Sequence, residues 1–108
     1  MKRRVVVTGM GVLSPLGNDL ASNWDAVING RSGIGPITHF DASAMATHFG
    51  GEIRDFDPKT WFNAKEVKKM DVFIHYGLAA SFMAMQDAGL EITEANVERA
   101  GVMIGSGI

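Results

Sequence analysis

Arg4-Val5-Val6-Val7-Thr8-Gly9-Met10-Gly11-Val12 is the stretch that decides the fold class of this chain. Its consecutive valines predict a buried strand over residues 4–8 that is covered on both faces. Gly9 and Gly11 follow the strand and mark a winding turn. We expect these glycines to supply positive φ values and to let another part of the chain approach closely.

A helix is predicted after this turn. Asn18 is a favourable N-cap residue, and Gly30 closes the helix as a C-terminal glycine. Between them, apolar residues recur at helical spacing: Leu20, Trp24, Val27 and Ile28. Strand, loop and helix therefore fill residues 4–29.

The next part of the chain, residues 30–63, predicts an ordered excursion with short strands or turns, one of them around residues 49–53. A longer helix is predicted over residues 65–88. It is apolar nearly all round from residue 72 to 85, which is typical of a buried helix. Several small residues in it would let another backbone approach: Gly77, Ala80, Ser81 and Ala84.

A last strand is predicted over residues 101–104, before Gly105-Ser106-Gly107. The order strand, helix, irregular excursion, helix, strand predicts an α/β fold with parallel strands and right-handed crossovers. Two such strands leave unpaired edges and bare apolar faces. We therefore expect further strands, from the rest of the polypeptide or from another chain, to complete the sheet. Residues 1–108 alone are expected to be aggregated or molten.

Length, net charge and residue content exclude several classes of partner and structure for this chain. The chain has 108 residues, the size of one small domain without an internal boundary, and a formal net charge of −2, which argues against nucleic acid as a partner. It contains no cysteine, so it can form no disulfide. The basic start lacks the cleavage site of a signal peptide, and cytoplasm follows as the default. A membrane span is rejected, because the apolar run is short and holds His75.

Gly9-Met10-Gly11 has the first glycines of a dinucleotide-binding fingerprint. Nucleotide binding is therefore the alternative to a plain turn at these residues. The position three residues past Gly11 is Ser14 rather than glycine, and Pro15 follows it. A lone G-x-G is a weak signal. Turn geometry is therefore the preferred interpretation.

Three lysines stand out on the second predicted helix. Lys65, Lys68 and Lys69 have the spacing i, i+3, i+4 and share one helical face. A solvated helix end is the plain interpretation of this spacing. The predicted helix begins at these residues, where its dipole disfavours cations, and that conflict suggests a function.

The histidines form no metal-binding pattern, so no metal site is predicted. His39 and His48 are expected in loops. His75 is expected to be a hydrogen-bonded packing residue inside the apolar helix. We find no pair of carboxylates suited to acid–base catalysis.

The chain resembles the β-ketoacyl synthases, with greatest similarity to their bacterial type II members. The matches occur in order, at the family's spacing, over nearly the whole chain: residues 3–18, Gly30-Arg31-Ser32-Gly33-Ile34, His39-Phe40-Asp41, Lys68-Lys69-Met70-Asp71, Gln86-Asp87-Ala88-Gly89-Leu90 and Gly105-Ser106-Gly107-Ile108. The resemblance implies a thiolase-like fold, a five-layer α-β-α-β-α sandwich built of two similar halves. Residues 1–108 would be the first portion of the N-terminal half, so the sandwich is incomplete in this chain.

The resemblance also implies an activity in fatty acid biosynthesis. A cysteine thiolate takes an acyl group from acyl carrier protein as a thioester. Malonyl carrier protein then loses carbon dioxide, and its carbanion attacks that thioester. Two histidines and backbone donors stabilise the developing charge. The cysteine and both histidines are expected downstream, so no catalytic residue maps to this chain. No cofactor is implied, and two chains form a homodimer.

Two groups of site residues follow from the resemblance. The lysines at 65, 68 and 69 would dock acyl carrier protein, and Ile108 would border the pocket for the acyl chain, with Gly107 giving room beside it. An alternative function is that of a non-catalytic scaffold, like the chain-length-factor subunits of polyketide systems. These keep the fold and lack the nucleophile.

Overall fold

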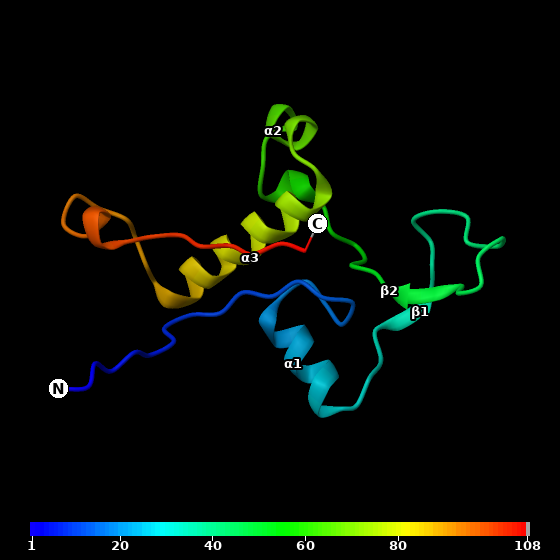
Figure 1. Ribbon diagram of the computed structural model, residues 1–108, viewed down its shortest axis with the longest axis horizontal. Coiled ribbons are helices and arrows are strands. Elements are labelled where there is room, and N and C mark those ends of the chain that lie inside the picture. The colour runs from blue at the N-terminus through cyan, green and yellow to red at the C-terminus, as the bar shows by residue number, and fades with distance from the viewer. Residues whose placement is uncertain (108) are drawn as a thin grey trace.

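The computed structural model describes residues 1–107. Its elements follow in the order α1 (Leu20–Ile28), β1 (Ile34–Pro36), β2 (Phe49–Gly51), the 3₁₀ turn η1 (Pro58–Thr60), α2 (Ala64–Lys69), α3 (Val72–Ala88) and the 3₁₀ turn η2 (Val97–Arg99) (Figure 1). The radius of gyration is 17.1 Å, whereas a compact domain of this length has about 13 Å. Within these residues no helix is long and apolar enough to cross a membrane.

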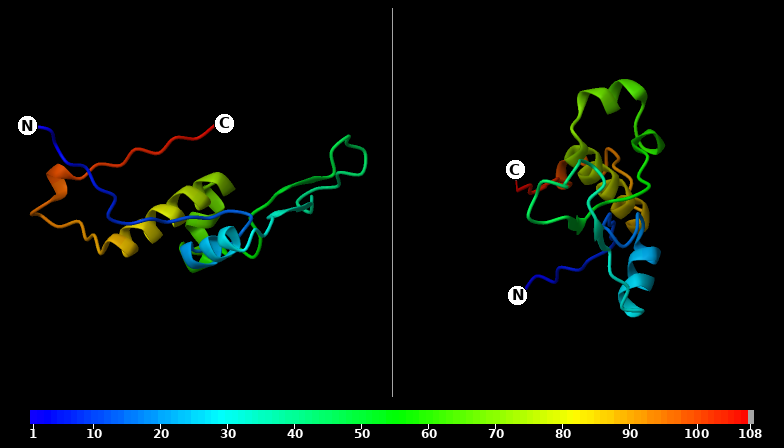
Figure 2. Two further views of the ribbon diagram at one scale, coloured as in Figure 1. Left: turned by 90° about the horizontal axis from the view of Figure 1, so that it is seen from below. Right: turned by 90° about the vertical axis from the view of Figure 1, so that its right-hand side faces the viewer.

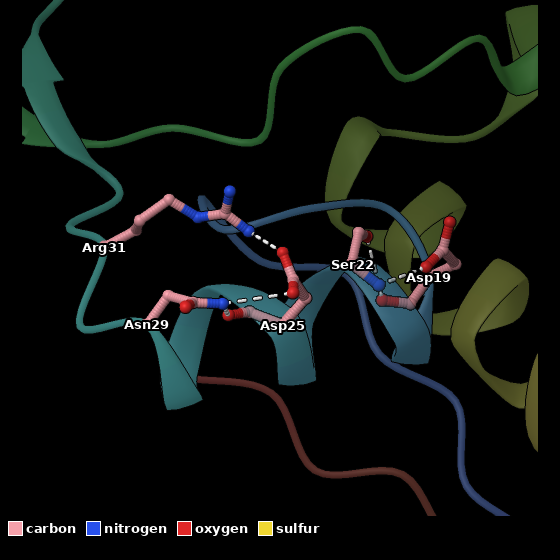
Figure 3. Close-up of polar contacts among 5 residues, drawn as sticks. All are labelled: Asp19, Ser22, Asp25, Asn29 and Arg31. Atoms are coloured by element: carbon pink, nitrogen blue, oxygen red, sulfur yellow. Dashed lines mark hydrogen bonds and ion pairs between the residues drawn. The ribbon is translucent and has the colours of Figure 1, made fainter.

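The first predicted helix is confirmed as α1, but its N-cap is Asp19 rather than Asn18. A side-chain oxygen of Asp19 accepts a hydrogen bond from the Ser22 backbone N–H at 2.7 Å (Figure 3). That bond is the main cause that holds the pKa of Asp19 below its ordinary value. Asn18 is not the cap, since its Nδ2 amide donates to the Arg54 carbonyl oxygen at 2.7 Å and its side-chain oxygen is buried without a hydrogen-bond partner in residues 1–107.

Polar contacts also close the C-terminal end of α1. The Asp25 carboxylate accepts from the Asn29 amide at 3.1 Å and pairs with the Arg31 guanidinium (Figure 3). Gly30 has a φ of +63°, as expected for a C-terminal glycine. The chain therefore turns sharply at Gly30 and leaves the helix toward β1.

Residues 31–54 form an arm that extends away from the helices (Figures 1 and 2). In it, β1 pairs with β2 in antiparallel register, with Ile34 opposite Gly51 and Pro36 opposite Phe49. The prediction of a short strand around residues 49–53 is thus confirmed. This two-stranded ladder is the whole sheet of residues 1–107, so the predicted parallel sheet is not formed by them.

The predicted strands 4–8 and 101–104 are extended segments without a ladder partner in the described residues. The prediction that residues 4–8 are buried is wrong for this structure, because Val5 is 93% exposed, and Met103 on the other segment is 99% exposed. The two segments run in the same direction, as parallel strands would, and residues 4–8 approach the end of α3 that Gly9 contacts (Figures 1 and 2). They lack a ladder because residues 1–107 supply no strand beside either of them.

The long helix predicted over residues 65–88 is divided into α2 and α3. Met70 leaves the helical conformation with φ −114° and ψ 141°. Asp71 then caps α3, since its side chain accepts from the Val72 backbone N–H at 2.6 Å. Gly89 ends α3 in the left-handed region, with a φ of +62°.

The N-terminal segment lies against α3 at two glycines. A Cβ atom on Gly11 would come within 2.0 Å of the Ala80 carbonyl oxygen, and one on Gly9 within 2.4 Å of the Ala84 carbonyl oxygen. The predicted close approach is therefore confirmed at the two glycines and at Ala80 and Ala84 of the helix, but not at Gly77, whose Cβ would meet nothing within 4 Å in residues 1–107. The predicted positive φ values are wrong, because in residues 1–107 the left-handed glycines are Gly30 and Gly89.

Burial in α3 is limited to His75 and Ala79, so the prediction of a helix buried all round is also wrong. Its other side chains are half-buried or exposed, among them Phe73 and Ile74. The few buried apolar residues of the described chain are Ala26, Ala42, Phe62 and Ala79. The apolar surface of α3 is therefore largely without a covering layer in residues 1–107.

Replacing Gly11 by alanine tests the contact with α3. In the complete protein we expect Gly11→Ala to lower the free energy of unfolding by about 1–3 kcal/mol, because the added methyl forces a backbone shift. Gly77→Ala is the matched control, since among residues 1–107 a Cβ there meets nothing within 4 Å, and alanine inside a helix should raise stability rather than lower it. Chemical denaturation of both variants gives the comparison, and equal stability of Gly11→Ala and the unchanged protein would contradict this close packing.

Candidate functional site

The helix α2 presents the basic surface singled out in the sequence. Lys65, Lys68 and Lys69 all lie within α2 and all are exposed. Their spacing places them on one side of this helix. We call these three residues the lysine surface.

Asn63 and Glu66 build a capping box that starts α2. The Asn63 side-chain oxygen accepts from the Lys65 and Glu66 backbone N–H groups at 3.1 and 2.9 Å. The Glu66 carboxylate accepts in return from the Asn63 backbone N–H at 3.1 Å. The acidic side chain of α2 is therefore turned back onto the start of the helix.

The lysine surface is left without internal charge compensation. Among residues 1–107 the ion pairs are Arg31–Asp25 and the contact of His39 with Glu52, so no carboxylate of this part of the chain pairs with these lysines. Lys68 and Lys69 lie in the last turn of α2, where the dipole favours cations. The predicted conflict with the helix dipole is thus wrong for Lys68 and Lys69, because α2 ends at Lys69, but it holds for Lys65 in the first turn of α2.

An aromatic cluster connects α2 to α3. The Phe62 ring stacks on the His75 imidazole with centroids 5.6 Å apart, and it lies 6.2 Å from the Phe82 ring. Trp61 also stacks on Phe82, with centroids 6.2 Å apart. We call Trp61, Phe62, His75 and Phe82 the aromatic cluster.

Lysine spacing alone does not connect Phe62 with the lysine surface, and the sequence prediction missed this residue. Phe62 directly precedes the cap residue Asn63, and Val67 follows Glu66. An apolar residue before a capping box and another after it is the pattern of a hydrophobic staple, and it signals a helix start. This pattern places the start of α2 at residue 64 and identifies Phe62 as the residue that fixes it.

The second predicted site lies at the far end of the described chain. Gly107 is exposed, and a Cβ there would meet nothing within 4 Å. Ile108 lies outside the described residues. The C-terminal segment runs back along α3 and ends near the start of that helix, which is also where α2 lies (Figures 1 and 2). The described end of the C-terminal segment and α2 therefore lie toward the same end of α3.

An apolar hollow separates the C-terminal segment from α3. Its lining includes Ser81 and Met85 of α3, Leu90, Ile92 and Val97 of the connection, and residues 100–104. The hollow is open, and no titratable side chain lines it. It can receive an apolar group but offers no acid–base chemistry.

The histidines are placed separately. His48 lies on the arm, where its Nδ1 is 2.8 Å from the Ala42 carbonyl oxygen. His75 is a packing residue, as predicted, but its Nε2 is buried without a hydrogen-bond partner in residues 1–107. The prediction of a hydrogen-bonded His75 is therefore wrong for this part of the chain.

Glu52 is a buried carboxylate that holds the arm together. It accepts hydrogen bonds from the Thr38 backbone N–H at 3.0 Å, from the Thr38 hydroxyl at 2.8 Å and from the His39 backbone N–H at 3.1 Å. The His39 bond is the main cause that lowers the pKa of Glu52. A carboxylate is a poor general base when its pKa is lowered and its oxygens already accept several hydrogen bonds. Glu52 therefore has a structural role.

Comparison of the amino-acid sequence with known proteins shows which family it is similar to. The family described as "Beta-ketoacyl synthase, N-terminal domain" matches residues 2–108. The chain is 56% identical over 107 residues to "3-oxoacyl-[acyl-carrier-protein] synthase 2" of Vibrio harveyi, covering 99% of this chain and 26% of that protein. It is 51% identical over 107 residues to the protein of the same name from Synechocystis, with the same coverage. The chain therefore spans about a quarter of the length of these curated relatives.

A solved structure supports the same relationship. The structure described as "The ishigamide ketosynthase/chain length factor" superposes with a TM-score of 0.77 at 37% sequence identity. The match covers 84% of this chain and 23% of that one. The α/β arrangement of this chain is thus shared with a ketosynthase-type protein.

The pKa of Glu52 predicts how the arm responds to pH. A lowered pKa in the folded state means that the Glu52 contribution is present above the ordinary glutamate pKa of about 4.3 and is lost as the pH falls through the lower folded value. In the complete protein we expect amide protection of residues 37–40, corrected for intrinsic exchange, to fall in this acidic range. Hydrogen exchange read by mass spectrometry gives the measurement.

Glu52→Gln should remove this pH dependence and reduce the protection at neutral pH, because an amide group cannot accept all these bonds. Glu94→Gln is the control, since that side chain is exposed. Unchanged protection of residues 37–40 in Glu52→Gln would contradict the role given to this carboxylate.

Proposed function

The chain belongs to the β-ketoacyl synthase family, and we propose that the complete protein is a 3-oxoacyl-[acyl-carrier-protein] synthase of fatty acid biosynthesis. The observation that carries this proposal is the 56% identity to a synthase 2 protein over 99% of the chain. The reaction is a decarboxylative condensation. A cysteine holds the acyl group as a thioester, malonyl carrier protein loses carbon dioxide, and the resulting carbanion attacks the thioester carbonyl.

We propose that residues 1–108 are the first portion of the N-terminal half of a thiolase-like α-β-α-β-α sandwich. The bare extended segments 4–8 and 101–104 support this proposal, because each presents unpaired backbone groups to any added strand. In the complete protein the reacting cysteine and two histidines then come from other parts of the polypeptide. A cytoplasmic homodimer is part of the same proposal. A cooperative thermal transition of isolated residues 1–108 would contradict it.

The lysine surface is proposed to dock acyl carrier protein. Its support is the exposure of all three ammonium groups and their lack of a partner carboxylate within residues 1–107. Each exposed ion pair formed with an acidic partner contributes about 0.2–1 kcal/mol. Three such pairs therefore act mainly by steering the partner and fixing its orientation.

A second candidate function is a non-catalytic scaffold that resembles a chain length factor. The similar solved structure favours keeping this candidate, because its name includes both a ketosynthase and a chain length factor. The two candidates differ at one residue. A synthase carries the nucleophilic cysteine in its complete sequence, and a scaffold of this class does not.

Assay of the complete protein tests the proposed function. Acyl carrier protein charged with an acyl group and malonyl carrier protein are supplied together, and the 3-oxoacyl product and released carbon dioxide are measured. We expect both products in equal amounts, and we expect alkylation of the cysteine with iodoacetamide to abolish them. A protein that yields neither product and contains no alkylatable cysteine is the scaffold.

Charge reversal on α2 tests the docking surface. In the complete protein we expect Lys65→Glu/Lys69→Glu to raise the KM for acyl carrier protein substrates roughly tenfold, because two attractive pairs become repulsive. The kcat should change little. Lys59→Glu is the control, since Lys59 is exposed but lies in η1 outside the lysine surface. An unchanged KM in the double variant would rule out docking here.

Ile108 and Gly107 are proposed to border the acyl pocket, on the resemblance alone. Ile108→Phe would then fill part of the pocket and shorten the acyl chains that the complete protein accepts. The measurement is the distribution of product chain lengths from an equimolar mixture of acyl substrates. The same distribution in variant and unchanged protein would remove Ile108 from the pocket.

A further inference from the structure

His75 is a buried polar side chain that the proposed reaction does not use and that, unlike the buried Glu52, has an unpartnered polar atom in residues 1–107. It lies in the first turns of α3 and is 5% exposed. Its Nε2 atom has no hydrogen-bond partner within residues 1–107. A buried ring nitrogen without a partner is unfavourable, and an apolar side chain of similar volume would avoid that penalty. The nitrogen at this position therefore indicates a partner outside the described residues.

The imidazole is coupled to the start of α2 through one aromatic contact. It stacks on Phe62 with an interplanar angle of 30°, and Phe62 is itself 8% exposed. Phe62 is followed at once by Asn63, the cap of α2. A displacement of the His75 ring would therefore displace Phe62, and with it the first turn of α2, the helix that carries the lysine surface.

The hydrogen-bond partner of Nε2 is expected to come from the part of the protein beyond residues 1–107. The chain spans 26% of the length of its curated relatives, so about three-quarters of a protein of that length lies outside it. The apolar residues Phe73 and Ile74, which precede His75 on α3, are exposed in the described residues. Their exposure indicates that further layers cover α3 in the complete protein, and such a layer would be the source of a polar partner for Nε2.

We infer that His75 is a positioning residue for the lysine surface. Its Nε2 forms a hydrogen bond with a polar group of the protein beyond residues 1–107, and this bond fixes the His75 ring, Phe62 and the start of α2 relative to the rest of the protein. His75 touches no substrate and acts only through Phe62. This inference rests on the proposed docking of acyl carrier protein at α2.

Two variants of the complete protein separate the bond from the packing. His75→Phe keeps an aromatic ring for the stack on Phe62 and removes the nitrogen. His75→Gln keeps a polar group at about the reach of Nε2. We expect His75→Phe to lower the melting temperature and to raise the KM for acyl carrier protein substrates roughly threefold, with kcat unchanged. His75→Gln, which keeps the hydrogen bond but loses the ring stacked on Phe62, should recover part of both losses.

The same acyl groups carried on free pantetheine provide the internal control, because they bypass α2. Their KM should not change in His75→Phe. If His75→Phe does not fold, His75→Met replaces it in the same comparison with His75→Gln. A phenylalanine variant as stable as the unchanged protein would overturn the hydrogen bond, and a destabilised variant with an unchanged KM for the carrier substrates would overturn the positioning role.

Failure of the proposed function gives a different result. In that case the unchanged protein makes no condensation product, or Lys65→Glu/Lys69→Glu leaves the KM for carrier substrates unaltered. The melting temperatures of His75→Phe and His75→Gln still report on the bond to Nε2, because they need no substrate. If the protein makes no product, or if the lysine variant leaves the KM unaltered, the positioning role of His75 is overturned. This holds even where the melting temperatures show that the bond to Nε2 is present.

Discussion

The contact between the N-terminal segment and α3 is the constraint on which the arrangement of this chain depends. Gly9 and Gly11 lie so close to the α3 backbone that no larger residue fits without a shift. Met10, between them, donates its backbone N–H to the Asp87 carboxylate at 2.9 Å. These contacts fix the position of residues 9–11 along the helix. They also determine where α1 begins, since the turn to Asp19 follows directly.

Because α3 is fixed to the N-terminal segment, it also orients α2 and the C-terminal segment. The aromatic cluster holds α2 at the start of α3, and the C-terminal segment returns to that same end (Figure 1). A protein bound to the lysine surface would lie near the exit of the C-terminal segment. This proximity is consistent with a docking surface and a pocket that serve one substrate.

Elements are predicted well from the sequence where local chemistry decides them, and poorly where distant parts of the chain decide. The spacing of apolar residues predicts the helix at 20–28, and turn residues predict the strand near residue 49. The end of α3 follows from Gly89, which adopts the left-handed conformation. The break at Met70 escapes prediction because the apolar pattern begins directly after it and gives no sign of a separate helix. The prediction of Asn18 as the cap fails because Asn18 and Asp19 are both favourable cap residues, and the sequence does not show that the Asn18 side chain turns toward Arg54 instead.

Burial is the quantity that the sequence predicts least well. A run of valines signals that a segment is covered in the finished protein, but it does not identify the covering layer. In residues 1–107 that layer is missing, and Val5 is consequently exposed. The lysine surface can be found by spacing, whereas its support by Phe62 and His75 requires the three-dimensional arrangement.

The capping box of α2 has a consequence for the conditions under which its charges act. With Glu66 bonded to the Asn63 backbone, none of the three lysines forms an ion pair with a carboxylate of residues 1–107. Charges of this kind attract over a distance set by dissolved ions, about 8 Å at physiological ionic strength and about 3 Å in molar salt. Attraction of an acidic partner to α2 should therefore weaken steeply with ionic strength, while the fold beneath it, built on glycine contacts and aromatic rings, is far less sensitive to salt.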